Sequence, residues 1–174
     1  EHARRTARQY GVEEQLRFLR CDGLQGIDPK DVDTVIIAGM GGETIIHILS
    51  QAPWTKNGDT MLLLQPMTKQ EELRRWLNEN GYAQYAERLV RDKNYLYPVF
   101  TVCGGAQTAL SVGEIYGGLD IEVDPLAGEY LAQRIRRLTQ AVDGLLKGGS
   151  ADNARRAQEL GEIITALKER RDAL

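Results

Sequence analysis

The chain has 174 residues, 42% of them hydrophobic and 27% charged, which is ordinary for a globular domain with a modest appendage. The formal net charge of −3 excludes a whole-protein attraction to nucleic acid or anionic membranes, so any nucleic-acid surface must come from local clusters of Arg and Lys. No apolar run is long enough to span a bilayer, and the charged N-terminus is unlike a signal peptide. We therefore expect a cytoplasmic protein.

The first third of the chain predicts a helix and two strands. Residues 1–10 favour a helix that stops at Gly11. Residues 16–21 suggest a short strand that ends at Asp22-Gly23, and the β-branched run 32–38 predicts a strand buried on both faces. The chain opens inside a helix without an initiator Met or a capping residue, so we expect a fragment of a longer protein.

The middle of the chain alternates between helical and strand patterns. Residues 43–51 predict a helix, 61–64 a buried strand ended by Gln65-Pro66, and 69–80 an amphipathic helix. Residues 83–91 and 95–103 predict two strands joined by a turn. This order predicts an α/β fold with a mainly parallel sheet and an antiparallel pair at its end.

The pattern changes after Pro125. Apolar residues recur at alternating steps of three and four residues on both sides of the turn-like segment 147–150, which predicts an antiparallel helical hairpin. These residues are Leu131, Ile135, Leu138, Val142 and Leu145 before the turn, and Ala157, Leu160, Ile164, Leu167 and Leu174 after it. We expect the hairpin to lean on the α/β body or on a partner. The domain boundary is predicted near residues 120–126, giving domains 1–124 and 125–174.

The most informative motif is the glycine-rich segment Ala38-Gly39-Met40-Gly41-Gly42, between a predicted buried strand and a predicted helix. In an open parallel sheet, ligands bind beyond the carboxyl ends of the strands, and glycines let the backbone approach a ligand closely. A tight turn that needs glycine only for steric reasons is an equally good interpretation. The spacing is neither that of a dinucleotide-binding fingerprint nor that of a P-loop.

Other polar residues follow predicted strands. Asp22 could accept a hydrogen bond from an exocyclic amine such as adenine N6, although a plain Asp-Gly turn is the more ordinary interpretation. Gln65 could offer donors and an acceptor toward the same crevice, or lie in a plain loop. No metal cluster, Ser/His/Asp set or paired carboxylates stand out. The isolated His47 suggests a packing or surface role, and the cysteines Cys21 and Cys103 are expected to be small buried side chains.

Basic residues are dense in two places. The predicted hairpin and the strand pair carry many Arg and Lys side chains, which could face phosphates or simply form a solvated surface. These residues are Arg134, Arg136, Arg137, Arg155, Arg156, Lys168, Arg170 and Arg171 in the hairpin, and Arg88, Arg91 and Lys93 in the strand pair.

The segments VDTVIIAGMGGETIIHIL, LLLQPM, LRRWLNENGY and ERLVRDKNYLYPVFTV together resemble the bacterial TrmK family of tRNA (adenine(22)-N1)-methyltransferases. The resemblance implies a Rossmann-like class I methyltransferase fold with a C-terminal coiled-coil-like helical hairpin. It also implies methyl transfer from S-adenosylmethionine to N1 of an adenine in the D-arm region of tRNA.

The resemblance also implies roles for single residues. Asp22, Gly23 and the segment Ala38-Gly39-Met40-Gly41-Gly42 match cofactor-binding positions, and Gln65 and Pro66 match the target side. Tyr95 lies in an aromatic stretch that we assign to the substrate. Arg136, Arg137, Arg155 and Arg156 are the residues we expect to contact tRNA phosphates. The sequence names no general base.

The chain departs from the family pattern at the N-terminal end. The family's two opening strands, which carry the Asp-x-Gly-like loop and the ribose-binding acidic residue, have no counterpart here, so we expect an incomplete sheet and impaired activity. Its free edge, or the hairpin, could support self-association. Two alternatives remain open: a Rossmann-like module that binds a nucleotide without catalysis, and an assembly protein that acts through the hairpin.

Overall fold

A computed structural model describes residues 1–174. Its helices and strands are α1 (His2–Gln9), β1 (Thr34–Gly41), α2 (Gly42–Ser50), β2 (Met61–Thr68), α3 (Gln70–Glu79), β3 (Tyr82–Asp92), β4 (Tyr95–Gly104), α4 (Val112–Gly117), α5 (Ala127–Lys147) and α6 (Ala151–Asp172). Short 3-10 turns lie between them, among them η1 (Glu13–Gln15) and η4 (Ile121–Val123). None of the helices is both long and apolar enough to cross a membrane.

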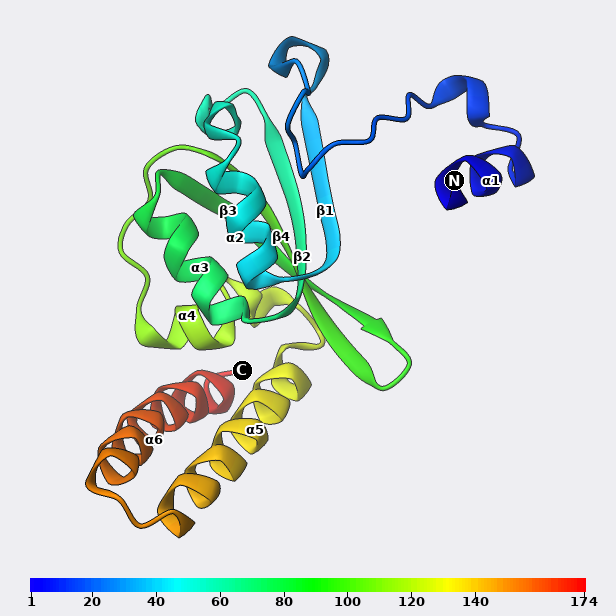
Figure 1. The fold of residues 1–174 in the computed structure, drawn as a ribbon. Helices are drawn as coiled ribbons and strands as arrows, with labels where there is room; N and C mark the ends of the chain where they lie inside the picture. The colour runs from blue at the N-terminus through cyan, green and yellow to red at the C-terminus, as the bar shows by residue number, and fades with distance from the viewer.

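The four strands form one sheet in the order β1-β2-β4-β3. β1 and β2 are parallel, whereas β4 is antiparallel to both of its neighbours, β2 and β3. Figure 1 shows α2 and α3 on one face of this sheet, with the α5–α6 hairpin beyond one end of it. The order of elements is that of a Rossmann-like α/β fold, as predicted. For these four strands the prediction of a mainly parallel sheet is wrong, because only one of the three pairings is parallel.

The main core lies between the sheet and its two covering helices. Val35 and Ile37 of β1 alternate with exposed residues, so this strand buries only one face, contrary to the prediction that both are buried. Ile45 and Leu49 of α2 and Leu73 and Leu77 of α3 fill the space against that face, together with Leu62, Leu64, Tyr82, Phe100 and Val102 of the other strands. The face opposite α2 leaves Ile36 68% exposed.

A second core joins the helical hairpin to the sheet. Leu131, Ile135, Ile164 and Leu167 line the inside of the hairpin, and they pack with Leu89 and Leu96 of the β3–β4 pair and with Ile121. The predicted hairpin and its turn are therefore confirmed, and so are the apolar stripes except at Leu174, which lies beyond the end of α6 and is 53% exposed. The expectation that the hairpin leans on the α/β body is also confirmed.

Three sequence predictions need correction. Residues 16–21 are extended but pair with no strand, because an isolated segment finds no hydrogen-bonding ladder however suitable its side chains are. β2 does not end at Gln65-Pro66 but continues to Thr68, and Pro66 lies beside Met40 of β1. Cys21, predicted to be a small buried side chain, is exposed, because it lies in the unpaired segment 16–21, outside both cores.

Candidate functional site

The carboxyl ends of β1 and β2 meet at one edge of the sheet and bring two of the predicted motifs together. Ala38 lies beside Gln65, and Met40 lies beside Pro66. The backbone N–H of Gly39 donates a hydrogen bond of 2.9 Å to Oε1 of Gln65. The glycine segment and the Gln65-Pro66 pair therefore form one site, although they are 26 residues apart in the chain.

A bulge at Gly39 lies next to the proline inside this strand pair. The register shifts between Ala38 and Met40, so Gly39 is the extra residue, and its φ of +76° is one that glycine adopts without strain. Pro66 has no N–H to give to a ladder, and it lies between this shift and a second one, between Met40 and Gly41, that leaves Met67 without a partner in β1. Gln65 then accepts the bond of the displaced Gly39 amide with its side chain.

Different physical causes explain why glycine occupies each position of this segment. A Cβ on Gly42 would lie 2.4 Å from the carbonyl oxygen of Lys69, so close packing of the β1–α2 and β2–α3 connections excludes a side chain there. A Cβ on Gly41 would lie 3.1 Å from Oγ1 of Thr68. A Cβ on Gly39 would meet no atom within 4 Å, so Gly39 faces open space. The steric interpretation therefore holds at Gly42, and the ligand-approach interpretation fits Gly39.

Lys69 also lies at this site, although the sequence pattern predicts it to be an ordinary helix residue. It precedes α3 in the left-handed region with φ of +58°, which a residue with a side chain adopts rarely. Its Nζ lies 2.5 Å from Glu72 and 3.9 Å from Glu43, which is on the first turn of α2. The hydrogen bond to Glu72 raises the pKa of Lys69. Nothing in the local sequence signals this backbone conformation.

Asp22 and Gly23 do not reach this site. A Cβ on Gly23 would lie 3.1 Å from Ile48, and Asp22 lines a small hollow with His47 and Gln51. Ile48 lies six residues along α2 from Gly42, about 9 Å at 1.5 Å per residue. The predicted strand that would carry Asp22 to the carboxyl edge is not formed, so the pair rests on the far end of α2 instead.

Tyr95 lies at the same end of the sheet as the glycine segment. It opens β4, which is antiparallel to β2, so Tyr95 lies five residues beyond the last paired position, Phe100 with Leu64, in the direction in which β2 runs toward its carboxyl end. Figure 1 shows the β3–β4 hairpin extending past that edge. Tyr95 is 56% exposed, and its ring centre lies 6.2 Å from that of Tyr97. The opposite face of this hairpin packs on α5 through Leu89 and Leu96.

The arginines of the helical hairpin fall into two groups. Arg136, Arg137, Arg155 and Arg156 are exposed, and the only ion pair among them joins Arg155 to Asp152 at 3.7 Å. Arg134 and Arg170, by contrast, bind backbone carbonyls and carboxylates at the base of the hairpin. Of the four arginines predicted to contact tRNA, three therefore make no ion pair, and Arg155 makes one with an exposed aspartate.

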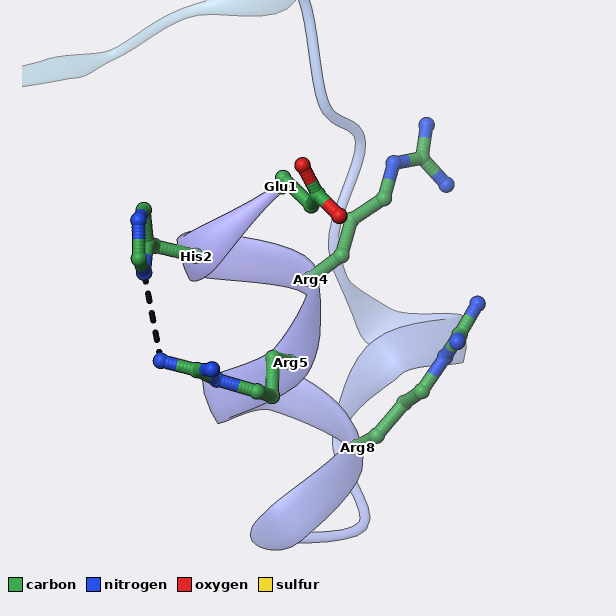
Figure 2. A pocket seen from close by; sticks show the side chains of 5 residues that line it. All are labelled: Glu1, His2, Arg4, Arg5 and Arg8. Carbon is green, nitrogen blue, oxygen red and sulfur yellow. Dashed lines mark hydrogen bonds between the residues drawn. The ribbon is translucent and has the colours of Figure 1, made fainter.

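A surface hollow on α1 lies apart from this site. Figure 2 shows it lined by Glu1, His2, Arg4, Arg5 and Arg8, with no apolar side chain among them. Figure 1 places α1 well away from the sheet. A gap between long charged side chains on an exposed helix lacks the apolar lining that ligand pockets usually have. No group of three or more His, Cys, Asp or Glu side chains could hold a metal ion.

The fold and the glycine-rich sheet edge define a class of protein: a Rossmann-like domain, a class that binds its ligands at the carboxyl ends of the parallel strands. Residues 1–100 match the family model described as "Methyltransferase domain". The chain therefore belongs to this methyltransferase family.

Relatives extend the match over nearly the whole chain. The tRNA (adenine(22)-N(1))-methyltransferase of Bacillus subtilis is 26% identical over 180 residues, which cover 96% of this chain and 74% of that protein. The crystal structure of the B. subtilis M1A22 tRNA methyltransferase TrmK superposes with a TM-score of 0.81 at 25% identity, covering 97% of this chain and 76% of that one. A putative tRNA (m1A22) methyltransferase of Streptococcus pneumoniae, in complex with S-adenosyl-L-methionine, gives 0.79 at 25% identity and covers 97% and 74%.

Proposed function

We propose that the protein transfers a methyl group from S-adenosylmethionine to N1 of adenine 22 in the D-arm region of tRNA. The observation that carries this proposal is the extent of the match. The tRNA methyltransferase of B. subtilis aligns with 96% of the chain, so the similarity includes the helical hairpin as well as the methyltransferase domain. Transfer RNA is the substrate, and the cytoplasm is the compartment where it would be met.

The glycine segment fits a ligand at the sheet edge. Gly39 presents its backbone to open space, and α2 begins three residues later with N–H groups that have no partner inside the helix. When bound, S-adenosylmethionine supplies a methyl group on a positively charged sulfur, which a ring nitrogen can attack directly. The residues Ala38, Gly39, Met40, Gly41 and Gly42 would lie along the cofactor. Asp22 and Gly23 would join them only if residues 16–21 form a strand.

The chain has to orient the target base rather than activate it. Adenine N1 is itself a nucleophile, so the reaction needs positioning and an in-line approach instead of a covalent enzyme intermediate. The base must first leave its stack. Gln65, whose Oε1 is engaged by Gly39, fixes the loop that faces the base, and Pro66 stiffens the adjoining strand. Tyr95 offers an exposed ring at the same end of the sheet for a base to stack on.

The hairpin is the part of the molecule that would hold the tRNA backbone. Arg136 and Arg137 on α5 and Arg155 and Arg156 on α6 present guanidinium groups to solvent, which bind phosphates well. Domain 1–124 would thus perform the chemistry, and domain 125–174 would grip the substrate. Self-association remains a separate proposal for the free edge of β1, testable by sedimentation.

The decisive experiment measures methylation and cofactor binding separately. Unmodified tRNA transcripts carrying adenine or guanine at position 22 are incubated with the chain and S-adenosylmethionine, and 1-methyladenosine is quantified by mass spectrometry. We expect product from the adenine transcript only. Product elsewhere in the tRNA would overturn the assigned position.

A longer version, which includes the two strands that the resemblance places ahead of residue 1, is assayed in parallel and titrated with S-adenosylmethionine by calorimetry. Cofactor binding and methylation by at least one version is the expected result. Cofactor binding without product in either version would favour a nucleotide-binding module. If neither version binds the cofactor, the proposal is wrong and the assembly alternative is favoured.

A further inference from the structure

Three arginines from three different helices converge on the short helix α4. Arg74 of α3 donates to the carbonyl oxygen of Ile115 at 2.8 Å, and Arg134 of α5 donates to that of Tyr116 at 3.1 Å. Arg170 of α6 donates to the carbonyl oxygens of Gly113 and Gly118 at 2.6 and 2.8 Å. The last carbonyls of a helix have no partner within it, so the bonds to Ile115, Tyr116 and Gly118 satisfy the C-terminal end of α4, while the bond to Gly113 ties Arg170 to its first turn.

Each of these arginines also holds a carboxylate. Arg74 binds Glu87 of β3, with 2.5 Å between Nη2 and Oε1, and neither side chain is exposed. Arg134 binds Glu71 of α3 at 2.9 Å. Arg170 binds Glu122, which lies in η4, with 2.7 Å between Nε and Oε1. Every guanidinium therefore bridges a carbonyl of the α4 segment and an acidic side chain of another element.

Two glycines allow α4 to lie directly against the hairpin. A Cβ on Gly113 would fall 2.9 Å from the Cδ of Arg170. A Cβ on Gly117 would fall 2.8 Å from Leu167 of α6 and 3.0 Å from Leu131 of α5. α4 therefore packs so closely on both hairpin helices that a side chain at either position would force Arg170, Leu167 or Leu131 to shift.

We infer that α4 is the mount that sets the direction of the α5–α6 hairpin, and that Arg134 and Arg170 are positioning residues for tRNA that act through it. Figure 1 shows the far half of the hairpin projecting away from the domain, so its direction is decided at its base. The inference rests on the proposed function, in which the exposed arginines of the hairpin hold the tRNA backbone. A fixed mount keeps those arginines at one distance from the glycine segment, and a pre-organised surface loses less entropy on binding.

The chemistry of the mount requires arginine rather than any cation. A guanidinium has five donors in a planar fork and can bind a carbonyl and a carboxylate together, whereas a lysine ammonium is a compact charge on a flexible stem. Arg134→Lys keeps the charge that tRNA would sense but loses the bridge. It should therefore behave like Arg134→Met if the bridge matters, and like the unaltered protein if only charge matters.

The first test measures the mount without tRNA. Spin labels are placed on cysteines introduced at the exposed positions His47 on α2 and Leu146 near the hairpin turn, with the native Cys21 and Cys103 changed to Ala. Pulsed electron resonance then gives the distribution of distances between hairpin and domain. We expect a narrow distribution in the parent protein.

The variants then decide the inference. Arg134→Met, Arg134→Lys and Arg170→Met should each broaden the distance distribution, whereas Arg171→Met should not, because Arg171 pairs only with the adjacent Asp172. Unchanged distributions in all the Arg134 and Arg170 variants would overturn the inference, as would a normal distribution in Arg134→Lys alone. If Arg170→Met does not fold, Glu122→Gln, which removes only a partly exposed partner of Arg170, takes its place.

The second test reads the consequence for tRNA. In the methylation-competent protein, the Arg134 and Arg170 variants should raise KM for tRNA about fivefold to tenfold, in the range that mutations in a coupling network produce, while kcat at saturating tRNA stays the same. Equal loss of kcat with unchanged KM would contradict the positioning role. A parent protein that makes no 1-methyladenosine would refute the proposed function, but the distance distributions would still test the mount.

Discussion

The buried pair Arg74–Glu87 gives the sharpest stability prediction, for the change Glu87→Gln. Neither side chain is exposed, and Glu87 also accepts hydrogen bonds from Nε2 of Gln84 at 2.8 Å and from the N–H of Leu119 at 3.1 Å. Glutamine has the same shape but no charge, and its NH2 group would face N–H donors that now bind the Glu87 carboxylate. Arg74, whose guanidinium lies 4.8 Å from the centre of the Phe100 ring, would keep a buried charge without a counter-ion.

The expected loss is large. Removing one partner of a buried ion pair destabilises a protein by about 3–5 kcal/mol, against a total free energy of unfolding of roughly 5–15 kcal/mol. For a chain of this size that corresponds to a fall in Tm of about 6–20 °C. Burial lowers the pKa of Arg74, but the attraction of Glu87 outweighs it, so the pKa is raised and the guanidinium stays charged. In the variant, Arg74 therefore cannot avoid the free-energy cost of its unpaired charge by releasing a proton.

Urea unfolding followed by circular dichroism at neutral pH measures the effect. Glu129→Gln is the matched control, because Arg91 and Glu129 also approach to 2.5 Å but are 41% and 45% exposed. Solvent screening makes such exposed pairs contribute little, so we expect almost no change in that control. If Glu87→Gln costs less than about 1 kcal/mol, or no more than the control, the reasoning from burial fails.

Four further outcomes follow from the site and the hairpin. Gly42→Ala should lower the free energy of unfolding by at least about 1–3 kcal/mol in thermal melts, because its Cβ would lie 2.4 Å from the Lys69 carbonyl oxygen, and a neutral effect would contradict the steric role. Gln65→Leu removes the acceptor of the Gly39 N–H, so hydrogen exchange of that amide should become faster, and an unchanged rate would rule out the bond. Burial alone would raise the pKa of Glu71, but the attraction of Arg134 outweighs burial, so the pKa is lowered. Ionised Glu71 therefore stabilises the folded protein above about pH 4.3, the pKa of an unfolded glutamate, and this stabilisation is lost as the pH falls through the folded pKa. Glu71→Gln should flatten that acid limb in urea titrations, and an identical limb would refute the assignment. Reversing the charge of the four exposed hairpin arginines should weaken tRNA binding and flatten its salt dependence, whereas an unchanged slope would exclude them as phosphate contacts.

The local sequence pattern predicted a helix or strand correctly where that element has one buried face. The β-branched run at 32–38 and the three-and-four spacing around 131–145 are both local signals, and both elements formed. The short helix α4 was missed although Ser111 and Glu114 form a capping box, which is readable as S-x-x-E. The motif is a local signal for a helix N-terminus, so α4 could have been predicted from the sequence.

Features that depend on a partner could not be predicted from the chain alone. Residues 16–21 have strand-like composition, but a strand exists only where another strand accepts it. The continuation of β2 past Pro66 accompanies register shifts against β1 that no pattern near Pro66 reveals. Likewise Arg74 is fully buried because Glu87, on the adjoining strand, is there to meet it. The roles assigned to the site residues remain predictions.

The detached position of α1 makes this end of the chain the easiest to cut. α1 packs mainly with η1, and the extended residues after η1 belong to no sheet, so this stretch can open without disturbing either core. Arg17 and Arg20 lie in it, exposed and unprotected by backbone hydrogen bonds, in the conformation that a protease active site accepts. Trypsin should therefore trim the chain there early and leave residues from β1 to α6 as a resistant core.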